Sequence, residues 1–253
     1  HQFFGENMLR ADVCNAVDEL GQLLDHTGPV AKSEHNAARI FNADHLFFVT
    51  NGTSTSNKIV WHSEVATDDI VLVDRNCHKS ILHAIMMTGT VPIFLQPTRN
   101  HLGIIGPIPL AEFDMASIRR KIDANPLVKD KSAKPRVLTI TQSTYDGILY
   151  NVDTIKQMLD EHVENLHFDE AWLPHATFHP LYHQMHAIGV NRPRCKRAMV
   201  FSTQSTHKLL AGLSQASQIL VQESESRRLD RYRFNESYLM HTSTSPQYAI
   251  IAS

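Results

Sequence analysis

The sequence lacks three features that would each indicate a particular class of protein. Its three cysteines, Cys14, Cys77 and Cys195, are scattered and show no CxxC spacing. This pattern excludes a disulfide framework and indicates reduced thiols, so we expect a cytoplasmic protein. No apolar run approaches the roughly 18 residues that span a bilayer, and no membrane segment is expected. The net charge is only −2, which gives no electrostatic reason to expect a nucleic-acid or anionic-membrane partner.

Several catalytic and metal-binding motifs are also absent. The chain contains neither the GxxxxGK[ST] phosphate loop nor the GxSxG turn of serine hydrolases. His179, His183 and His186 have helical spacing, which leaves a metal site as an alternative reading. Pro180 interrupts this segment, and no carboxylate lies close to the three histidines. We therefore predict structural or surface roles for them, and no metal ion.

The pattern that the chain does contain is an alternation of strand-like and helix-like segments. Its 253 residues, 42% of them apolar, suffice for one substantial core. Strands are predicted at 46–50, 70–73, 91–95, 137–141, 165–168, 197–201 and 218–221, the last returning antiparallel to 197–201. Helices are predicted at 11–24, 53–61, 78–87, 114–122 and 153–163, with Gly28-Pro29 ending the first. The alternation predicts an α/β fold with a mixed, mostly parallel sheet flanked by helices.

Polar clusters follow several of these strands directly. They are Gly52-Thr53-Ser54, the segment from Asp74 to His78, Asp169, and Ser205 to Lys208. Because ligands of open α/β sheets bind outside the carboxyl ends of the strands, we expect these clusters to share one rim.

The amine of Lys208 and the carboxylate of Asp169 have a setting that suits pyridoxal phosphate. Small hydroxyl residues precede Lys208 and an apolar segment follows it, and such surroundings can desolvate an amine and make it nucleophilic. This cofactor needs an amine for a Schiff base, a buried carboxylate beside its pyridine nitrogen, and an anion seat for its phosphate. Considered alone, Lys208 could equally be an ordinary surface lysine. Asp169 alone could equally be a helix cap or a metal ligand.

Two further segments add to this site. Gly52-Thr53-Ser54 is a glycine turn that opens a helix, which is typical of a phosphate seat and equally of an ordinary N-cap. His78 begins a helical stretch. Its ring would either stack on a planar cofactor or be a surface side chain at the start of the helix without a binding role.

Six spaced motifs make the resemblance to a known family specific. The chain resembles the major, cofactor-binding domain of the bacterial ornithine/lysine/arginine decarboxylases of fold type I. The motifs are Phe4-Gly5-Glu6-Asn7, Leu24-Asp25-His26-Thr27-Gly28-Pro29, Asn51-Gly52-Thr53-Ser54, Phe168-Asp169-Glu170-Ala171-Trp172, Ser205-Thr206-His207-Lys208 and His241-Thr242-Ser243-Thr244-Ser245-Pro246. The resemblance implies that residues 1–253 form one pyridoxal-phosphate-binding domain, with residues 1–45 as its N-terminal helical segment.

The resemblance also implies a role for each matching residue. Lys208 would be the Schiff-base lysine, Asp169 the partner of the pyridine nitrogen, and His78 the ring that stacks on the cofactor. Lys208 or His207 would return a proton to the substrate. The phosphate would be held by Thr53, Ser54, Ser205 and His207, and the ring bordered by Ala171 and Trp172. Thr244 would reach the site of the neighbouring subunit, because these enzymes build the site at a homodimer interface, in some cases within a higher oligomer.

The implied activity is decarboxylation of a basic L-amino acid to the corresponding amine and CO2, in polyamine metabolism or acid resistance. Lysine or arginine is favoured over ornithine as the substrate. Transamination or elimination on the same scaffold, and a non-catalytic homologous subunit, remain alternatives. Many members have serine at the position of Glu170, which would alter the surroundings of Asp169. Members are also longer, with an N-terminal wing and a C-terminal domain, so we expect these residues to be part of a longer chain.

Overall fold

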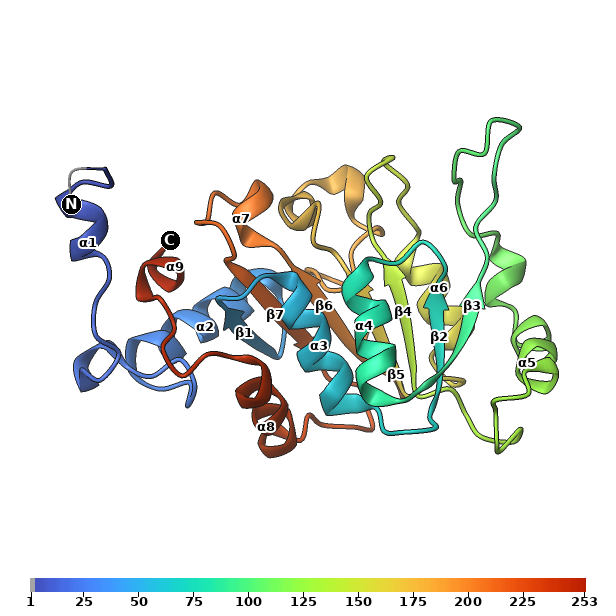
Figure 1. Ribbon diagram of the computed structural model, residues 1–253. Helices are drawn as coiled ribbons and strands as arrows, with labels where there is room; N and C mark the ends of the chain where they lie inside the picture. The colour runs from blue at the N-terminus through green and yellow to red at the C-terminus, as the bar shows by residue number, and fades with distance from the viewer. Residues whose placement is uncertain (1–2) are drawn as a thin grey trace.

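A seven-stranded mixed sheet runs through the centre of the molecule, in a computed structural model that describes residues 3–253 (Figure 1). The strand order is β1-β7-β6-β5-β4-β2-β3, and only β7 runs antiparallel to its neighbours. The strands are β1 (His45–Val49), β2 (Ile70–Asp74), β3 (Val91–Leu95), β4 (Val137–Thr141), β5 (Asn165–Asp169), β6 (Met199–Gln204) and β7 (Ser217–Gln222). The predicted mixed, mostly parallel sheet and the antiparallel return from β6 to β7 are confirmed.

The inner strands are buried on both faces, and β2 accordingly is an apolar run rich in β-branched residues. All five residues of β2 are buried, as are all those of β5 and β6. At the edge of the sheet, β3 pairs only with β2 and carries Pro92. A proline is tolerated there because an edge strand has one side without ladder hydrogen bonds.

One face of the sheet is covered by α3 (Thr53–Glu64), α4 (Lys79–Thr88) and α8 (Arg231–His241), which lie in front of it in Figure 1. Trp61 of α3 and Ile81 of α4 are fully buried against Val71 of β2. Towards β7, Phe234 and Tyr238 of α8 join the apolar cluster formed by β1, β6 and β7. The side chain of α3 that matters most for the site, Asn57, also points into this face.

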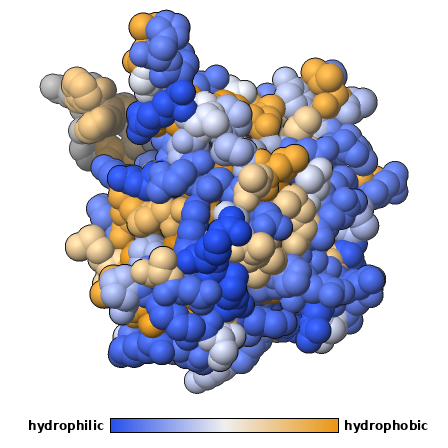
Figure 2. Space-filling model, turned by 90° about the vertical axis from the view of Figure 1, so that its right-hand side faces the viewer, coloured by the Kyte–Doolittle hydropathy of each residue, from blue (hydrophilic) through white to orange (hydrophobic). Residues whose placement is uncertain are grey.

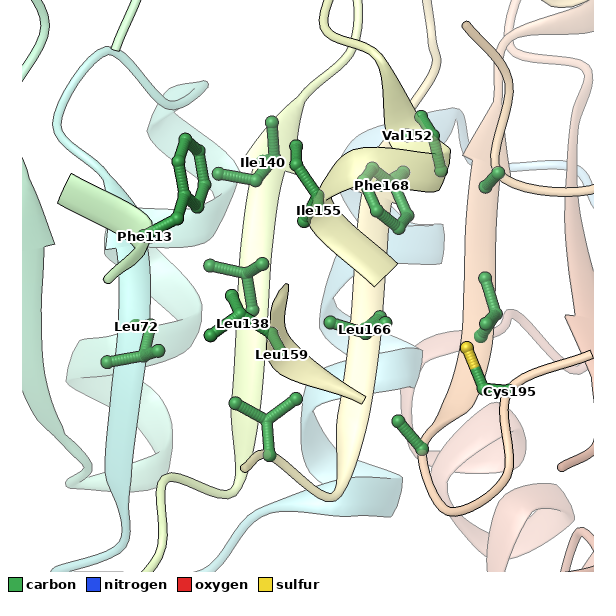
Figure 3. Close-up of a cluster of buried hydrophobic side chains, with 14 of the residues drawn as sticks. Leu72, Phe113, Leu138, Ile140, Val152, Ile155, Leu159, Leu166, Phe168 and Cys195 are labelled. Atoms are coloured by element: carbon green, nitrogen blue, oxygen red, sulfur yellow. The ribbon is translucent and has the colours of Figure 1, made fainter. Parts of the chain in front are cut away.

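The opposite face is covered by α2 (Gly28–Phe41), α5 (Met115–Ala124) and α6 (Val152–Leu159). Figure 3 shows Ile155 and Leu159 of α6 lying over Leu138 of β4 and Leu166 of β5. Each of these four side chains is at most 1% exposed. Burial of one such side chain contributes about 1.5–3 kcal/mol, so this layer holds the central strands firmly in place.

The helix predicted at 11–24 is wrong, and a helix that the pattern missed begins at Gly28. Between residues 11 and 24 the structure forms only the short 3-10 turn η1 (Asp18–Leu20). Val13 and Val17 are exposed there, so their helical spacing does not reflect burial in this chain. Gly28-Pro29 starts α2 instead of ending a helix, because proline has no N–H to lose in a first turn.

The other four predicted helices are confirmed within a few residues. Asp114 caps α5 by accepting a hydrogen bond from the Ser117 N–H, and Asn125 ends it. The remaining elements are short: α1 (Glu6–Arg10), η2 (Leu110–Phe113), η3 (Pro174–Phe178), η4 (Pro180–Tyr182), α7 (Thr206–Leu209) and α9 (Tyr248–Ala252). Within residues 3–45, the helical elements are α1, η1 and α2.

The segment with the spaced histidines forms 3-10 turns and a loop, not the helix that would bring the three rings together. Among residues 3–253, no three His, Cys, Asp or Glu side chains are grouped so as to hold a metal ion. Nor does this part of the chain contain a helix with the length and apolar character required to cross a bilayer. Figure 2 shows the side of the molecule beyond β3 and α5, which is largely hydrophilic with hydrophobic groups in separate patches.

Candidate active site

The predicted polar clusters do meet at one rim of the sheet. The segments that follow β1, β2, β4, β5 and β6 enclose a pocket of about 720 Å³ at the carboxyl ends of these strands. Nine of the predicted site residues line it: Thr53, Ser54, His78, Asp169, Ala171, Trp172, Ser205, His207 and Lys208. Thr244 lies outside this pocket on an exposed loop, where its carbonyl accepts a hydrogen bond from Asn15.

Lys208 reaches the pocket from α7, the single turn that follows β6. Its Nζ lies 5.6 Å from the ring centroid of Tyr145 and 5.6 Å from that of Trp172. The two rings meet edge to face, with centroids 5.1 Å apart. Ammonium groups within about 6 Å of an aromatic face are attracted by its quadrupole. These rings therefore hold the amine of Lys208 inside the pocket.

Asp169 is the last residue of β5, and its side chain points towards α3. Its Oδ2 accepts a hydrogen bond from Asn57 Nδ2 at 2.9 Å, and its Oδ1 one from the Ala171 N–H at 3.2 Å. Burial raises the pKa of Asp169, while the hydrogen bonds from Asn57 and Ala171 act in the opposite direction. A buried carboxylate that lines a pocket is well suited to bind a cationic nitrogen.

His78 is the N-cap of α4 and shares the pocket with Asp169. Its Nδ1 accepts hydrogen bonds from the Ser80 N–H at 3.2 Å and from the Ser80 hydroxyl at 2.8 Å. Burial lowers the pKa of His78 below its usual range, although the Asp169 carboxylate opposes this shift. A neutral ring in this position can stack on a planar ligand without adding charge.

Two groups of small polar residues form an anion seat on the other side of the pocket. Gly52 has a φ of 75°, which lets the chain turn sharply from β1 into α3. Thr53 and Ser54 then occupy the first turn of α3, whose N–H groups have no partner within the helix. The Thr53 hydroxyl lies 2.6 Å from the hydroxyl of Ser205, so two strand ends contribute to one seat.

His207 stands beside this seat with one ring nitrogen already occupied. Its Nδ1 lies 2.7 Å from the carbonyl of Ala216, and a carbonyl can only accept, so Nδ1 carries a hydrogen. Nε2 of the neutral ring is then an acceptor. Donation from His207 Nε2 to a phosphate therefore requires the protonated imidazolium.

Glu170 points to the opposite face of the sheet from Asp169, because successive side chains of a strand alternate. Its carboxylate accepts hydrogen bonds from the Ala187 N–H, the Ser202 hydroxyl and the side-chain amide of Gln204. Burial by itself would raise the pKa of Glu170, but the nearby His186 ring and these donors lower it overall. Glu170 thus anchors the segment after β5 and does not enter the pocket.

Among the pocket-lining residues that the sequence patterns missed, two contact predicted site residues directly, Asn57 and Tyr145. Asn57 was not singled out, although it follows Thr53 by four positions and therefore lies on the same side of α3. Tyr145 lies in the loop after β4 and contributes one wall of the Lys208 site. Its position after the predicted strand at 137–141 was the available signal, because the ends of β1, β2, β5 and β6 at this rim contributed to the prediction.

Comparison with known proteins identifies the family. The family model described as "Orn/Lys/Arg decarboxylase, major domain" matches residues 1–253. The chain belongs to this family. The resemblance inferred from the six motifs is thus confirmed.

Individual members of the family match over the whole chain. The lysine decarboxylase LdcA of Pseudomonas aeruginosa is 59% identical over 253 residues, the biodegradative arginine decarboxylase of Escherichia coli 44% over 254, and an ornithine decarboxylase of Haemophilus influenzae 37% over 263. These matches cover 100% of this chain but only 34%, 34% and 36% of the relatives, so the chain spans about a third of their length.

Solved structures agree with this assignment. Lysine decarboxylase A from Pseudomonas aeruginosa superposes with a TM-score of 0.95 at 59% identity, covering 100% of this chain and 34% of that one. An alanine aminotransferase from Pyrococcus furiosus superposes with a TM-score of 0.60 at 12% identity, over 97% of this chain and 58% of that one. At that identity only the fold is shared, and it is the predicted fold of the type I pyridoxal phosphate enzymes.

Proposed function

We propose that this protein binds pyridoxal phosphate in the pocket at the sheet rim and decarboxylates a basic L-amino acid. One observation carries the proposal. The amine of Lys208 and the buried carboxylate of Asp169 line the same pocket as the hydroxyl pair of Thr53 and Ser205. Membership of a family of amino-acid decarboxylases supports the same conclusion.

The donor set of the pocket fits this cofactor. The first turn of α3 and the hydroxyls of Thr53 and Ser205 suit a phosphate. Asp169 suits a protonated ring nitrogen, and the exposed ring of His78, which lines the pocket, suits the face of a flat heterocycle. Ala171 and Trp172 follow Asp169 directly and would border the ring. The volume of about 720 Å³ lies within the range of small-molecule sites.

Each residue would then have a defined task. When bound, the cofactor supplies the electron sink that makes loss of CO2 from an amino acid feasible. Lys208 would hold the cofactor at rest through Nζ and, once released by the substrate amine, would deliver a proton to the substrate carbon. The carboxylate of Asp169 would keep a proton on the ring nitrogen, and His78 would fix the plane of the ring. His207 is the second candidate for the proton donor.

Lysine is the substrate that we propose first, with arginine next and ornithine last. This order follows the identity of the relatives named for these reactions, which is 59%, 44% and 37%. We further propose a homodimer in which Thr244 of one subunit reaches the pocket of the other. The exposure of Thr244 supports this arrangement.

The test is an assay of CO2 release from lysine, arginine and ornithine, using the full-length protein with pyridoxal phosphate. We expect the largest kcat/KM for lysine. Lys208→Ala should abolish both CO2 release and the visible absorbance of the protein-bound cofactor. Lys129 is an exposed lysine that does not line the pocket, so Lys129→Ala should change neither. Keto-acid formation without CO2 would indicate an aminotransferase. A Lys208→Ala variant that kept its absorbance and its CO2 release would refute the assignment of Lys208 as the lysine that holds the cofactor.

A further inference from the structure

A continuous chain of buried hydrogen bonds crosses the sheet beneath the pocket and ends at Asp169. It begins at the indole of Trp61, whose Nε1 lies 3.2 Å from the hydroxyl of Thr139. Thr139 Oγ1 lies 3.2 Å from His167 Nδ1, and His167 Nε2 lies 3.0 Å from Thr203 Oγ1. The chain thus passes over three neighbouring strands, β4, β5 and β6, on the face that α3 covers.

The second half of the chain connects Thr203 to two residues of the site. Thr203 Oγ1 donates to Asn57 Oδ1 at 2.6 Å. Asn57 Nδ2 donates to Asp169 Oδ2 and to Ser80 Oγ, in both cases at 2.9 Å. The Ser80 hydroxyl then lies 2.8 Å from Nδ1 of His78. The chain therefore divides at Asn57 and reaches both the carboxylate and the imidazole of the pocket.

The direction of each bond is fixed from the Asn57 end. The amide oxygen of Asn57 can only accept, so the Thr203 hydroxyl donates its hydrogen to Asn57 Oδ1 and must accept from His167 Nε2. His167 therefore carries its hydrogen on Nε2 when neutral, and its Nδ1 accepts the hydrogen of the Thr139 hydroxyl. Thr139 in turn accepts from the indole of Trp61, which can only donate.

The environment holds His167 in this neutral form. The ring is fully buried between two hydroxyl groups, with 0% of its surface exposed. Burial lowers the pKa of His167 to about 3, although Glu170 opposes the shift. Trp61, Thr139, Thr203 and Asn57 are each 0% exposed as well, so water does not compete for these bonds.

We propose that His167 and Thr203 are positioning residues that orient the amide of Asn57 and thereby aim the carboxylate of Asp169 at the ring nitrogen of the cofactor. This inference rests on the proposed function, because it takes Asp169 as the partner of that nitrogen. Without the hydrogen from Thr203, the Asn57 amide loses the bond that fixes its oxygen, and its Nδ2 is held less firmly against the carboxylate. The donor that stabilises the charged form of Asp169 is then weakened.

The chain offers matched variants that separate this role from general damage. Thr203→Val removes the hydroxyl and keeps the shape, whereas Thr203→Ser keeps the hydroxyl. Ser63→Ala removes a different buried hydroxyl, on α3, which donates to the carbonyl of Val60 and lies off the chain of bonds. Thr139→Val interrupts the same chain two bonds further from Asn57.

The experiment measures dissociation constants of two cofactors by titrating the full-length apoprotein. One is pyridoxal phosphate, and the other is its analogue with C–H in place of the ring nitrogen. The Thr203→Val variant should bind pyridoxal phosphate about tenfold more weakly, because a hydrogen bond to a charged group is weakened. Binding of the analogue, which has no nitrogen for Asp169 to hold, should stay within about twofold. Thr203→Ser and Ser63→Ala should bind both compounds like the wild type.

The possible results separate clearly. An equal loss for both compounds, or no loss for either, overturns the positioning role. If Thr203→Val does not fold, the same two affinities are measured for Thr139→Val. We expect this variant to lose affinity for pyridoxal phosphate but not for the analogue. A wild-type protein that does not bind pyridoxal phosphate would instead overturn the proposed function and, with it, this inference.

Discussion

The hydroxyl groups of Thr53 and Ser205 lie 2.6 Å apart, although the two residues are 152 positions apart in the chain. Thr53 begins α3 after β1, and Ser205 precedes α7 after β6. Both are buried, at 6% and 2% exposure, so their contact is part of the folded interior. The anion seat is therefore built from two segments that only the completed sheet brings together.

This pair predicts how cofactor binding depends on the phosphate. Thr53→Val and Ser205→Ala should each weaken pyridoxal phosphate about tenfold, because each removes one hydrogen bond to a charged group. Binding of pyridoxal, which has no phosphate, should hardly change. Thr55→Val, on the same helix but outside the pocket lining, is the control. Equilibrium titration of the wild-type apoprotein and the three variants measures these constants, and an equal loss of affinity for pyridoxal would contradict the assignment.

Asp169 should be indispensable for turnover. Asp169→Asn removes the negative charge beside the ring nitrogen, and loss of one such electrostatic group costs about 10²–10³-fold in kcat. Asp74→Asn is a matched control, since Asp74 is a buried carboxylate at the end of the nearby parallel strand β2 and does not line the pocket. It should keep most of its kcat for CO2 release. A wild-type kcat in Asp169→Asn would refute the role.

His167 should make the stability of the protein depend on pH. Its pKa of about 3 in the folded state lies below the usual value of about 6.5 in an unfolded chain. The unfolded state therefore binds more protons between these values, and stability falls as the pH is lowered from about 6.5 towards 3. The expected slope is up to about 1.4 kcal/mol per pH unit.

His167→Gln isolates this contribution, because glutamine can accept from Thr139 and donate to Thr203 but does not titrate. Urea unfolding of both proteins between pH 7 and pH 4 would measure the difference. The wild type should lose stability faster than the variant over this range. Parallel curves would mean that His167 is not the group responsible.

Even the most conservative substitution of Glu170, by glutamine, should destabilise the protein. Three donors converge on its two carboxylate oxygens, and Glu170→Gln would replace one of these acceptors by an amide N–H that faces a buried donor. Two buried donors would then face each other without an acceptor, which should lower the free energy of unfolding by about 1–3 kcal/mol. Glu161→Gln, at an exposed position, should stay within about 0.5 kcal/mol. Thermal or urea unfolding distinguishes the two.

The sequence predicted the sheet well because the strands are short apolar runs bounded by turn residues. The strands at 91–95 and 137–141 match β3 and β4 to the residue. The pocket lining followed from the same pattern, since parallel strands end at a common rim. The spacing of Val13 and Val17 misled because it resembles a buried helix face, whereas both side chains are exposed.

The hydrogen-bond chain to Asp169 could not be predicted in the same way. The strand at 165–168 was read as an apolar run, yet it contains His167, fully buried. What makes this histidine tolerable is the register of the sheet, which sets Thr139 directly opposite it. The same sheet sets Thr203 opposite Asp169. Such partnerships depend on strand order and register, which local patterns do not specify.

The reversed direction of β7 has one more consequence. Because β7 runs against β1 and β6, its first residues lie at the rim where those strands end. The Gly52 N–H donates to the Gln215 carbonyl at 2.8 Å, and the His207 N–H donates to the Ala216 carbonyl at 3.2 Å. Both halves of the anion seat are thus fastened through main-chain atoms to one short stretch. Side-chain replacements around the pocket leave these attachments intact, whereas deleting a single residue between 210 and 216 would displace both halves at once.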